Sequence, residues 1–418
     1  MLRRFLGENS IGKRGFLVIT ILFLSVFGWY YMTLPVIEGI LTGLNPNYTE
    51  NLAIWATFYL SIIGASILGT FLSKKVDRLK FLYIWTVLGV VASLLPALLI
   101  NVTFWQVWSV SLLLGASFGL GVPSCLAYFA ECTIVENRGR VGGITLLIAY
   151  LSVPLLANLS DTSTFDLATI SVIFALVRGL GLIVFFQKPE KQASSQITAS
   201  VSFISILRDK TFLLYFIAWS VFPLVDSFAR VLVDNYLEFD YINPDLLGNM
   251  SIVEPLVAVL SILIAGLLCD WIGRKKIVLS GFVALGVAYA IIGLVPNHDF
   301  SWYLYFVVDG VAWGIFSLIF VLILWGDLAQ SGSSQKYYTL GSIPFFLNSI
   351  IPLVLTKTFV DQVELSLAFS FASFVLFIAV MPLMFAPETL PEKKMELRRL
   401  RSFAEEARKA KEKYERKK

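Results

Sequence analysis

The chain has 418 residues, of which 57% are apolar and 15% are charged, and its mean hydropathy is +0.78. This apolar content is more than a soluble core of this length needs, so the composition excludes a soluble protein. The formal net charge of +4 arises in residues 387–418, which hold 12 of the 33 basic residues.

The apolar residues gather in twelve stretches of roughly 20 residues, the length that crosses about 30 Å of hydrocarbon. Only a helix satisfies its backbone polar groups within one such segment, so we expect an all-α integral membrane protein. The first stretch lacks a convincing cleavage site, and we interpret it as a retained membrane helix rather than a signal peptide. The predicted spans are 15–40, 52–73, 81–100, 105–128, 141–159, 167–187, 211–236, 249–269, 277–296, 302–325, 339–358 and 365–386.

The longest polar interruption, residues 188–210, divides the spans six and six. We therefore expect two six-helix bundles, residues 1–187 and 211–386, joined by this linker and followed by a cytoplasmic basic tail, residues 387–418. Apolar residues from Phe203 onward recur at helical spacing, which suits a short helix on the inner leaflet as well as an irregular loop. The tail has an apolar stripe among its charges, which suits an amphipathic helix that is either solvated or attracted to anionic lipid.

Basic residues between the spans indicate the orientation. With the N-terminus inside, 30 of the 33 basic residues fall in cytoplasmic segments, and the other three, Arg178, Arg230 and Lys357, fall inside predicted spans. The external loops then contain none. We therefore expect a multi-pass protein of the cell membrane with both termini in the cytoplasm.

Charged motifs recur in the two halves of the sequence at nearly constant offsets, as in transporters whose similar bundles rock about a site between them. They lie after spans two and eight, after spans four and ten, and at the end of each half. The matched pairs are Asp77 with Asp270, Glu131 with Asp327, Arg140 with Lys336, and Pro189 with Pro387, at offsets of 193 to 198 residues.

The motif after span eight reads G-x-x-x-D-x-x-G-R-K over residues 266–276. With this motif and the twelve-span plan, the chain resembles the major facilitator superfamily of secondary transporters, which carries the motif after spans two and eight. The first copy departs from it, because Ser73 and Lys80 stand where glycines are expected. The loop from Glu131 to Arg140 is similar to the family's loop after span four, and residues 387–389 are similar to the end of its sugar-porter branch.

The resemblance implies a cytoplasmic latch that is closed when the cavity opens outward. Asp77 is then expected to face the start of span eleven near Leu340 and Gly341, and Asp270 the start of span five near Gly142 and Gly143. A carboxylate at a helix end can accept hydrogen bonds from the free N–H groups of a neighbouring helix. The alternative is a charged loop that only fixes the topology. The predicted latch residues are Asp77, Arg78, Glu131, Arg138, Arg140, Gly266, Asp270, Gly273, Arg274 and Asp327.

Charged side chains within the spans cost roughly 2.5–3.5 kcal/mol each on insertion scales, so they usually face a cavity or a partner. Asp226 and Arg230 are four residues apart on span seven and able to pair, and Asp309 lies two turns into span ten. The resemblance implies that spans one, four, seven and ten line a central cavity, where the three side chains can meet. A purely structural ion-pair network is the alternative.

Two further charges complete the predicted substrate and proton pathway. Arg178 has no acidic neighbour in its own span, so its partner must come from elsewhere, and Glu254 lies about one turn inside span eight as a pathway or rim residue. We assign Asp309 as the proton carrier, because no basic residue lies within a turn of it and burial disfavours its charge. Asp226 and Arg230 are assigned as a substrate or gate pair.

Other kinds of site lack the residues that they need. The three cysteines follow no metal or redox spacing, and His298 is the single histidine, so we expect no metal and no cofactor. We expect no enzyme activity, because no nucleophile stands at a recognisable spacing from a base. We also expect no nucleic acid as a partner.

The leading hypothesis is a monomeric secondary transporter that moves a small polar organic solute by alternating access. Buried carboxylates favour proton-coupled symport, with the proton as coupling ion. A facilitative uniporter, a proton antiporter, and a non-transporting receptor or sensor are the alternatives.

The orientation predicts the side from which Cys132, after span four, is accessible. Because all basic residues of the loops fall on one side, a membrane-impermeant thiol reagent should label Cys132 only from the cytoplasmic face. Labelling of intact cells and of inside-out vesicles measures this, and modification of Cys132 from the outside would contradict the orientation.

Overall fold

The computed structural model describes residues 11–99, 102–160, 162–186, 201–239, 243, 245–329, 333–355 and 363–390, and these residues form helices and connecting turns without a strand. Twelve helical segments among them are long and apolar enough to cross a membrane. They correspond one to one to the twelve predicted spans. The all-α architecture expected from the apolar stretches is therefore confirmed.

Several spans consist of two helices, because a proline or a change of helix type interrupts them. Pro123, Pro154 and Pro352 stand in the first turn of the second helix of a pair, where the missing N–H is tolerated. In span ten, the π-helical segment η4 lies between two α-helices. The spans are α2 (Lys13–Leu44), α3 (Tyr48–Leu72), α4 (Arg78–Ser93), α5 (Phe104–Gly119) with α6 (Val122–Cys132), α7 (Arg138–Leu151) with α8 (Val153–Leu159), α9 (Leu167–Phe186), α11 (Lys210–Phe239), α12 (Asp245–Ile272), α13 (Arg274–Leu294), α14 (Asp299–Phe316) with η4 (Ser317–Ile323) and α15 (Leu324–Leu328), α16 (Ser334–Asn348) with α17 (Ile351–Val354), and α19 (Leu365–Phe385).

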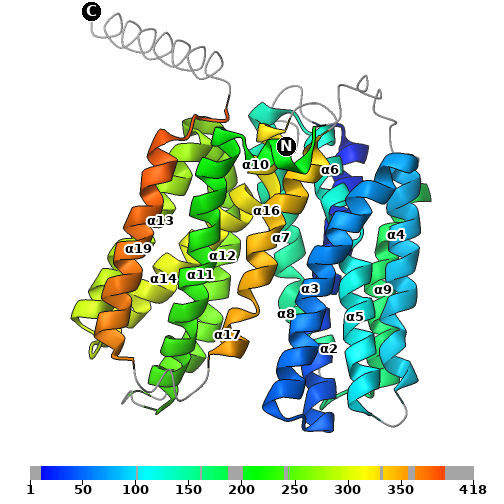
Figure 1. Cartoon of the computed structure of the whole chain (residues 1–418), viewed down its shortest axis with the longest axis horizontal. Coiled ribbons are helices and arrows are strands. Elements are labelled where there is room, and N and C mark those ends of the chain that lie inside the picture. Colours follow the sequence, from blue (N-terminus) through cyan, green and yellow to red (C-terminus); the bar gives the residue numbers. More distant parts are fainter. Residues whose placement is uncertain are drawn as a thin grey trace, which may run out of the picture.

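The helices form two groups that lie side by side (Figure 1). We call α2 to α9 the N-half and α10 to α19 the C-half. Within the N-half, α3 packs against α5, and α9 against α2 and α4; within the C-half, α12 packs against α14, and α13 against α19. Two helix pairs, α7 with α12 and α3 with α16, make the main contacts between the halves.

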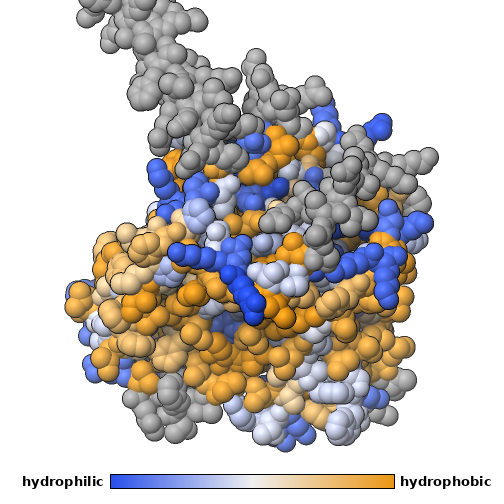
Figure 2. Space-filling view, turned by 45° about the horizontal axis from the view of Figure 1, so that its top comes forward, coloured by the Kyte–Doolittle hydropathy of each residue, from blue (hydrophilic) through white to orange (hydrophobic). Residues whose placement is uncertain are grey.

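The flank of the molecule is apolar, as a membrane protein requires. Large side chains such as Leu68, Leu155 and Phe374 are each more than half exposed. Figure 2 shows hydrophobic residues around the sides and hydrophilic residues at both ends, with more of the strongly hydrophilic ones toward the end at the top of the view. The loops at that end carry Lys74 and the starts of α7, α13 and α16, and we call it the basic end.

Part of the predicted linker forms a helix. Residues 188–200 lie outside the described residues, but α10 (Phe203–Leu207) follows them, and its Ser202 cap accepts a hydrogen bond from the Ser205 N–H. Ile206 is buried, and the ring of Phe203 packs edge-on against Phe71 with centroids 5.7 Å apart. The predicted tail helix falls beyond Leu390 and lies outside the described residues as well.

The turn between α12 and α13 needs a glycine. Gly273 has a φ of +113°, and a Cβ atom there would lie 2.4 Å from an oxygen of Glu388. The Glu388 carboxylate accepts hydrogen bonds from the N–H groups of Arg274 and Lys275, at 2.9 and 3.1 Å. It thus caps the start of α13, where the helix leaves N–H groups free and favours a negative charge.

Replacing Gly273→Ala should lower the thermal unfolding midpoint of the purified protein. The backbone conformation is costly for any residue with a Cβ, by about 1–3 kcal/mol, and the added atom displaces the Glu388 cap. Gly248→Ala in α12 is the matched control, because a Cβ there meets nothing within 4 Å. Equal midpoints for the two variants would contradict this reading of the turn.

Candidate functional site

The carboxylate of Asp270 joins the two halves at the basic end. Its Oδ1 accepts a hydrogen bond from the backbone N–H of Gly139, and its Oδ2 accepts one from that of Arg140, both at 2.9 Å. These N–H groups belong to the first turn of α7, where they have no partner within the helix. The structure therefore has the predicted contact of Asp270 with span five, but at the very start of the helix rather than near Gly142 and Gly143.

Two glycines allow this approach of α12 to α7. A Cβ atom on Gly139 would lie 2.6 Å from the carbonyl oxygen of Gly266, and one on Gly266 would lie 2.5 Å from the carbonyl oxygen of Gly139. A side chain at either position would push the helices apart and break the hydrogen bonds of Asp270. Gly266, the first residue of the motif, thus allows the close helix approach that the hydrogen bonds of Asp270 require.

Buried ion pairs surround this contact. Asp327 on α15 accepts hydrogen bonds from Arg138 of the N-half and from Nε of Arg274, the latter at 3.1 Å. Nη2 of Arg274 also lies 3.2 Å from Oδ1 of Asp270. The side chains of Asp270, Asp327 and Arg274 are fully buried, and that of Arg138 is 5% exposed. Nε of Arg140, whose side chain is partly exposed, lies 3.8 Å from Oδ2 of Asp270 as well. Two buried carboxylates thus lie among three guanidinium groups, and removal of a carboxylate leaves buried positive charge without its partner.

The prediction for Asp77 is wrong in this structure. Its Oδ1 accepts hydrogen bonds from the N–H groups of Leu79 and Lys80, so Asp77 caps its own helix α4 and does not face Leu340 or Gly341. Ser73 stands where the other motif has Gly266, and its hydroxyl bonds to Gln335 of α16, while the start of α4 supplies the N–H donors for Asp77.

Neutral hydrogen bonds take the place of that contact between α3 and α16. The hydroxyls of Thr70 and Thr339 lie 2.7 Å apart, and Ser73 donates a hydrogen bond to Oε1 of Gln335 at 2.7 Å. Nε2 of Gln335 in turn donates to Ser124 of α6 at 2.6 Å. The basic end is therefore closed by two different interfaces, one ionic and one neutral.

The remaining predicted latch residues form a bridge at the surface. Nη1 of Arg78 donates to Oε1 of Glu131 at 2.7 Å within the N-half. Ser334 of α16 donates to the same oxygen at 3.1 Å. Glu131 thus links the loop after span four to the start of span eleven.

The predicted pathway residues of the C-half form a second cluster, inside that half. Asp309 on α14 is fully buried, and neither of its oxygens has a hydrogen-bond partner among the described residues. Its carboxyl group interacts electrostatically with Asp226 of α11, Glu254 of α12 and Arg230 of α11. Three carboxyl groups and one guanidinium therefore share a site of low polarity.

The pairing within this cluster differs from the prediction. Arg230 donates a hydrogen bond to Oε1 of Glu254 on the neighbouring helix rather than pairing with Asp226 in its own helix. Glu254 is 8% exposed, so it is a buried member of the cluster and not a rim residue. An i, i+4 spacing permits a pair, but the guanidinium reaches across to α12.

Arg178 lies apart from this cluster, in the N-half. It is 1% exposed, and none of its guanidinium nitrogens has a hydrogen-bond partner in the part of the chain that the structure describes. Its Cζ lies 4.0 Å from the centroid of the Trp85 ring and 5.7 Å from that of Trp29. The predicted partner of Arg178 is therefore aromatic rather than acidic, and the cation–π contact compensates for part of its lost hydration.

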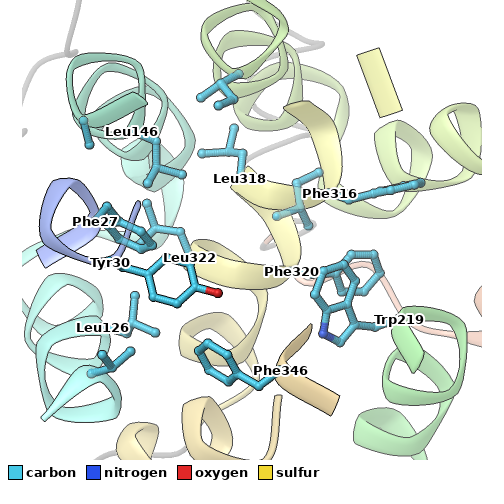
Figure 3. Close-up of a cluster of buried hydrophobic side chains, with 14 of the residues drawn as sticks. Phe27, Tyr30, Leu126, Leu146, Trp219, Phe316, Leu318, Phe320, Leu322 and Phe346 are labelled. Carbon is cyan, nitrogen blue, oxygen red and sulfur yellow. The ribbon is translucent and has the colours of Figure 1, made fainter. Parts of the chain in front are cut away.

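A pocket lies between the halves, lined from α2, α5, α6 and α7 on one side and from α11, η4, α15 and α16 on the other. Its empty space of about 540 Å³ includes open solvent. Aromatic side chains dominate its walls. In Figure 3, Tyr30 of the N-half faces Trp219, Phe320 and Phe346 of the C-half.

None of the charged residues predicted for the pathway lines this pocket. Asp226, Arg230 and Asp309 do come together, but none of them borders this pocket, so their facing the solute path stays a prediction. Of the lining residues, Tyr30, Tyr31 and Trp219 were candidates for stacking on a substrate, but they were not assigned because aromatic residues in a membrane protein are also common as interface anchors and core residues. The only signal available was their position on the spans that the resemblance places around the cavity.

Opening of the latch should expose Cys269, whose Sγ lies under the start of α7. The thiol is buried, and a Cβ atom on Gly139 would lie 2.4 Å from it. In a chain in which Cys125 and Cys132 are replaced by serine, we expect Asp270→Asn to raise the alkylation rate of Cys269 severalfold, because it leaves Arg274 partly unpaired.

Asp77→Asn is the matched control, because the hydrogen bonds that Asp77 makes with described residues stay within its own helix. It should leave the rate of Cys269 alkylation unchanged. A similar increase in both variants, or in neither, would show that the contact of Asp270 with α7 does not hold this end closed.

No protein-family model matches the sequence, and no curated protein sequence matches it. Solved structures do match. The human organic anion transporter MFSD10 (TETRAN) is 16% identical with a TM-score of 0.66, over 89% of this chain and 99% of that chain. The proton:xylose symporter XylE of the major facilitator superfamily, solved with 6-bromo-6-deoxy-D-glucose, is 13% identical with a TM-score of 0.69, over 90% of this chain and 96% of its own. The chain therefore has the fold of the major facilitator superfamily, as its sequence motif implied.

Proposed function

We propose that this protein is a secondary transporter that moves a small organic solute through the membrane by alternating access, in symport with protons. The observation that carries the proposal is Asp309, a fully buried carboxyl group without a hydrogen-bond partner among the described residues, next to Asp226, Glu254 and Arg230. Its fold, which MFSD10 and XylE share, supports the same proposal.

The latch supports alternating access. A site between two bundles can open to either side in turn if the contacts that close one end can be broken and remade. At the basic end, Asp270 and Asp327 hold α7 and Arg138 of the other half through hydrogen bonds and ion pairs, without a covalent link. These polar groups can be satisfied by water when the end opens. We place this end in the cytoplasm, on the distribution of basic residues.

The balance of charge in the C-half supports coupling to protons. With all three carboxyl groups ionised, the cluster would hold two more negative than positive charges in a buried site, which is costly. Arg230 bonds to Glu254, so Asp309 is the group with least compensation. It therefore carries a proton while it is buried. A movement of the C-half helices that admits water to Asp309 allows that proton to leave.

Replacing Asp309→Asn should abolish solute accumulation driven by a pH gradient and leave exchange of the solute intact. The measurement uses proteoliposomes that contain the full chain and a pH-sensitive dye. Sugars, amino acids, organic acids and neutral aromatic compounds are added in turn, and acidification of the lumen is recorded with uptake of the labelled compound. For the wild type we expect at least one compound to cause both.

Glu38→Gln is the matched control, because Glu38 is an exposed carboxylate on α2. It should keep proton-coupled uptake. Accumulation by Asp309→Asn at the normal proton stoichiometry would place the carrier elsewhere. Solute movement without proton movement in the wild type would make the protein a uniporter.

A further inference from the structure

The walls of the pocket present ring faces from both halves of the molecule. On the N-half side, Tyr30 stacks on Phe118 with centroids 4.9 Å apart and an interplanar angle of 26°. On the C-half side, Trp219 stacks on Phe320 with centroids 4.8 Å apart and an angle of 17°. Phe346 stands edge-on to Tyr30, at 6.1 Å, between these two stacks. The space is thus bordered by flat apolar surfaces.

Most polar atoms of the lining are already used within the protein; the indole N–H of Trp325 has no partner among the described residues, but it is buried and packs against Gly341. The indole N–H of Trp219 donates to the carbonyl oxygen of Gly341 at 2.8 Å, and the Tyr338 hydroxyl donates to that of Leu322 at 2.6 Å. The Ser342 hydroxyl donates to the carbonyl oxygen of Thr339 at 3.0 Å. These side chains can therefore contact a ligand through their apolar atoms, but their N–H and O–H groups already donate hydrogen bonds within the protein.

Tyr30 is different. Its hydroxyl makes no hydrogen bond with any residue that the structure describes, although the side chain is only 4% exposed. Figure 3 shows this oxygen pointing from α2 toward the opposite half, where Trp219 and Phe346 lie. The neighbouring rings of Tyr31 and Tyr150 stand edge to face at 5.5 Å, so those two hydroxyls have each other as neighbours. Tyr30 thus offers the pocket a hydrogen-bonding group without a protein partner.

No charged side chain is among the lining residues. An ionised ligand would lose its hydration without a counter-charge, and a sugar would lose several hydrogen bonds with water for few in return. An apolar ring system has no charge to dehydrate and no hydrogen bonds with water to lose, and it gains contact with the aromatic walls.

We infer that the pocket binds a flat, uncharged and mainly apolar organic molecule with one hydrogen-bonding group, whose rings lie between the Tyr30–Phe118 and Trp219–Phe320 stacks and whose polar group meets the Tyr30 hydroxyl. This inference rests on the proposed function, because it names the class of solute that the transporter carries. It replaces the polar solute that the charged residues of the spans suggested.

Equilibrium binding to the full chain in lipid nanodiscs tests the inference without transport. The probe is radiolabelled 1-naphthol, and the competitors are naphthalene, which lacks the hydroxyl, 1-naphthoate, which is charged, and xylose. We expect saturable binding of 1-naphthol, roughly two- to tenfold weaker binding of naphthalene, the value of one neutral hydrogen bond, and far weaker binding of the other two.

Three variants assign the binding to this pocket. Tyr30→Phe should make naphthalene and 1-naphthol equal. Tyr338→Phe is the matched control, since it removes a pocket hydroxyl that is already bonded to Leu322, and it should keep the difference between the two compounds. Ser342→Trp should fill the space and abolish saturable binding, whereas partition of the probe into lipid stays the same.

Xylose or 1-naphthoate binding as tightly as 1-naphthol would overturn the inference. So would a lack of saturable binding, or an unchanged preference for 1-naphthol in Tyr30→Phe. Failure of the proposed function is a separate result, because selective binding can be measured in a protein that moves neither solute nor protons. Conversely, proton-coupled uptake of a sugar would support the transporter and reject this pocket as its solute site.

Discussion

A set of ion pairs around two buried carboxylates at the basic end determines how the two halves meet. Arg138 reaches Asp327 across the interface, Arg274 joins Asp327 to Asp270, and Asp270 accepts the first N–H groups of α7. Burial of each carboxylate away from water is costly, and the guanidinium group beside it compensates for that cost. Partial opening would leave buried charges without partners. The network therefore favours two discrete states, closed with all contacts or open with all groups in water, as the proposed alternating access would require.

The two interfaces that are equivalent by internal symmetry are built differently. Where α12 meets α7, Gly266 lets the backbones approach and Asp270 bonds directly to a helix start. Where α3 meets α16, Ser73 carries a side chain, and hydroxyl and amide groups make neutral hydrogen bonds, of which Thr70 with Thr339 is one. A neutral hydrogen bond leaves no buried charge when it is lost, whereas loss of one partner of a buried ion pair does. The α12–α7 contact is thus the one that a single substitution disturbs more.

Sequence reasoning succeeded where one local pattern decides the structure. Twelve apolar stretches were enough for the spans, and the motif around Asp270 was enough for its contact with span five, because spacing and helix chemistry determine both. It failed where several helices compete for one side chain. The spacing of Asp226 and Arg230 permits a pair, yet Glu254 from α12 is the acceptor. The aromatic partners of Arg178 come from other helices, and no spacing within span six could indicate them.

None of the buried charges of the C-half borders the pocket, so in the proposed symport proton and solute influence each other through the residues between them. Trp313 of α14 neighbours Asp226, and its ring stands edge-on to Phe222 with centroids 5.0 Å apart. Phe222 in turn lies 6.1 Å from Trp219, which borders the pocket. Packed rings transmit a displacement because they cannot be compressed. In the proposed symport, a shift of α14 against α11 when Asp309 loses its proton would therefore reach the solute as a change in the position of the Trp219 ring, without any charge entering the pocket.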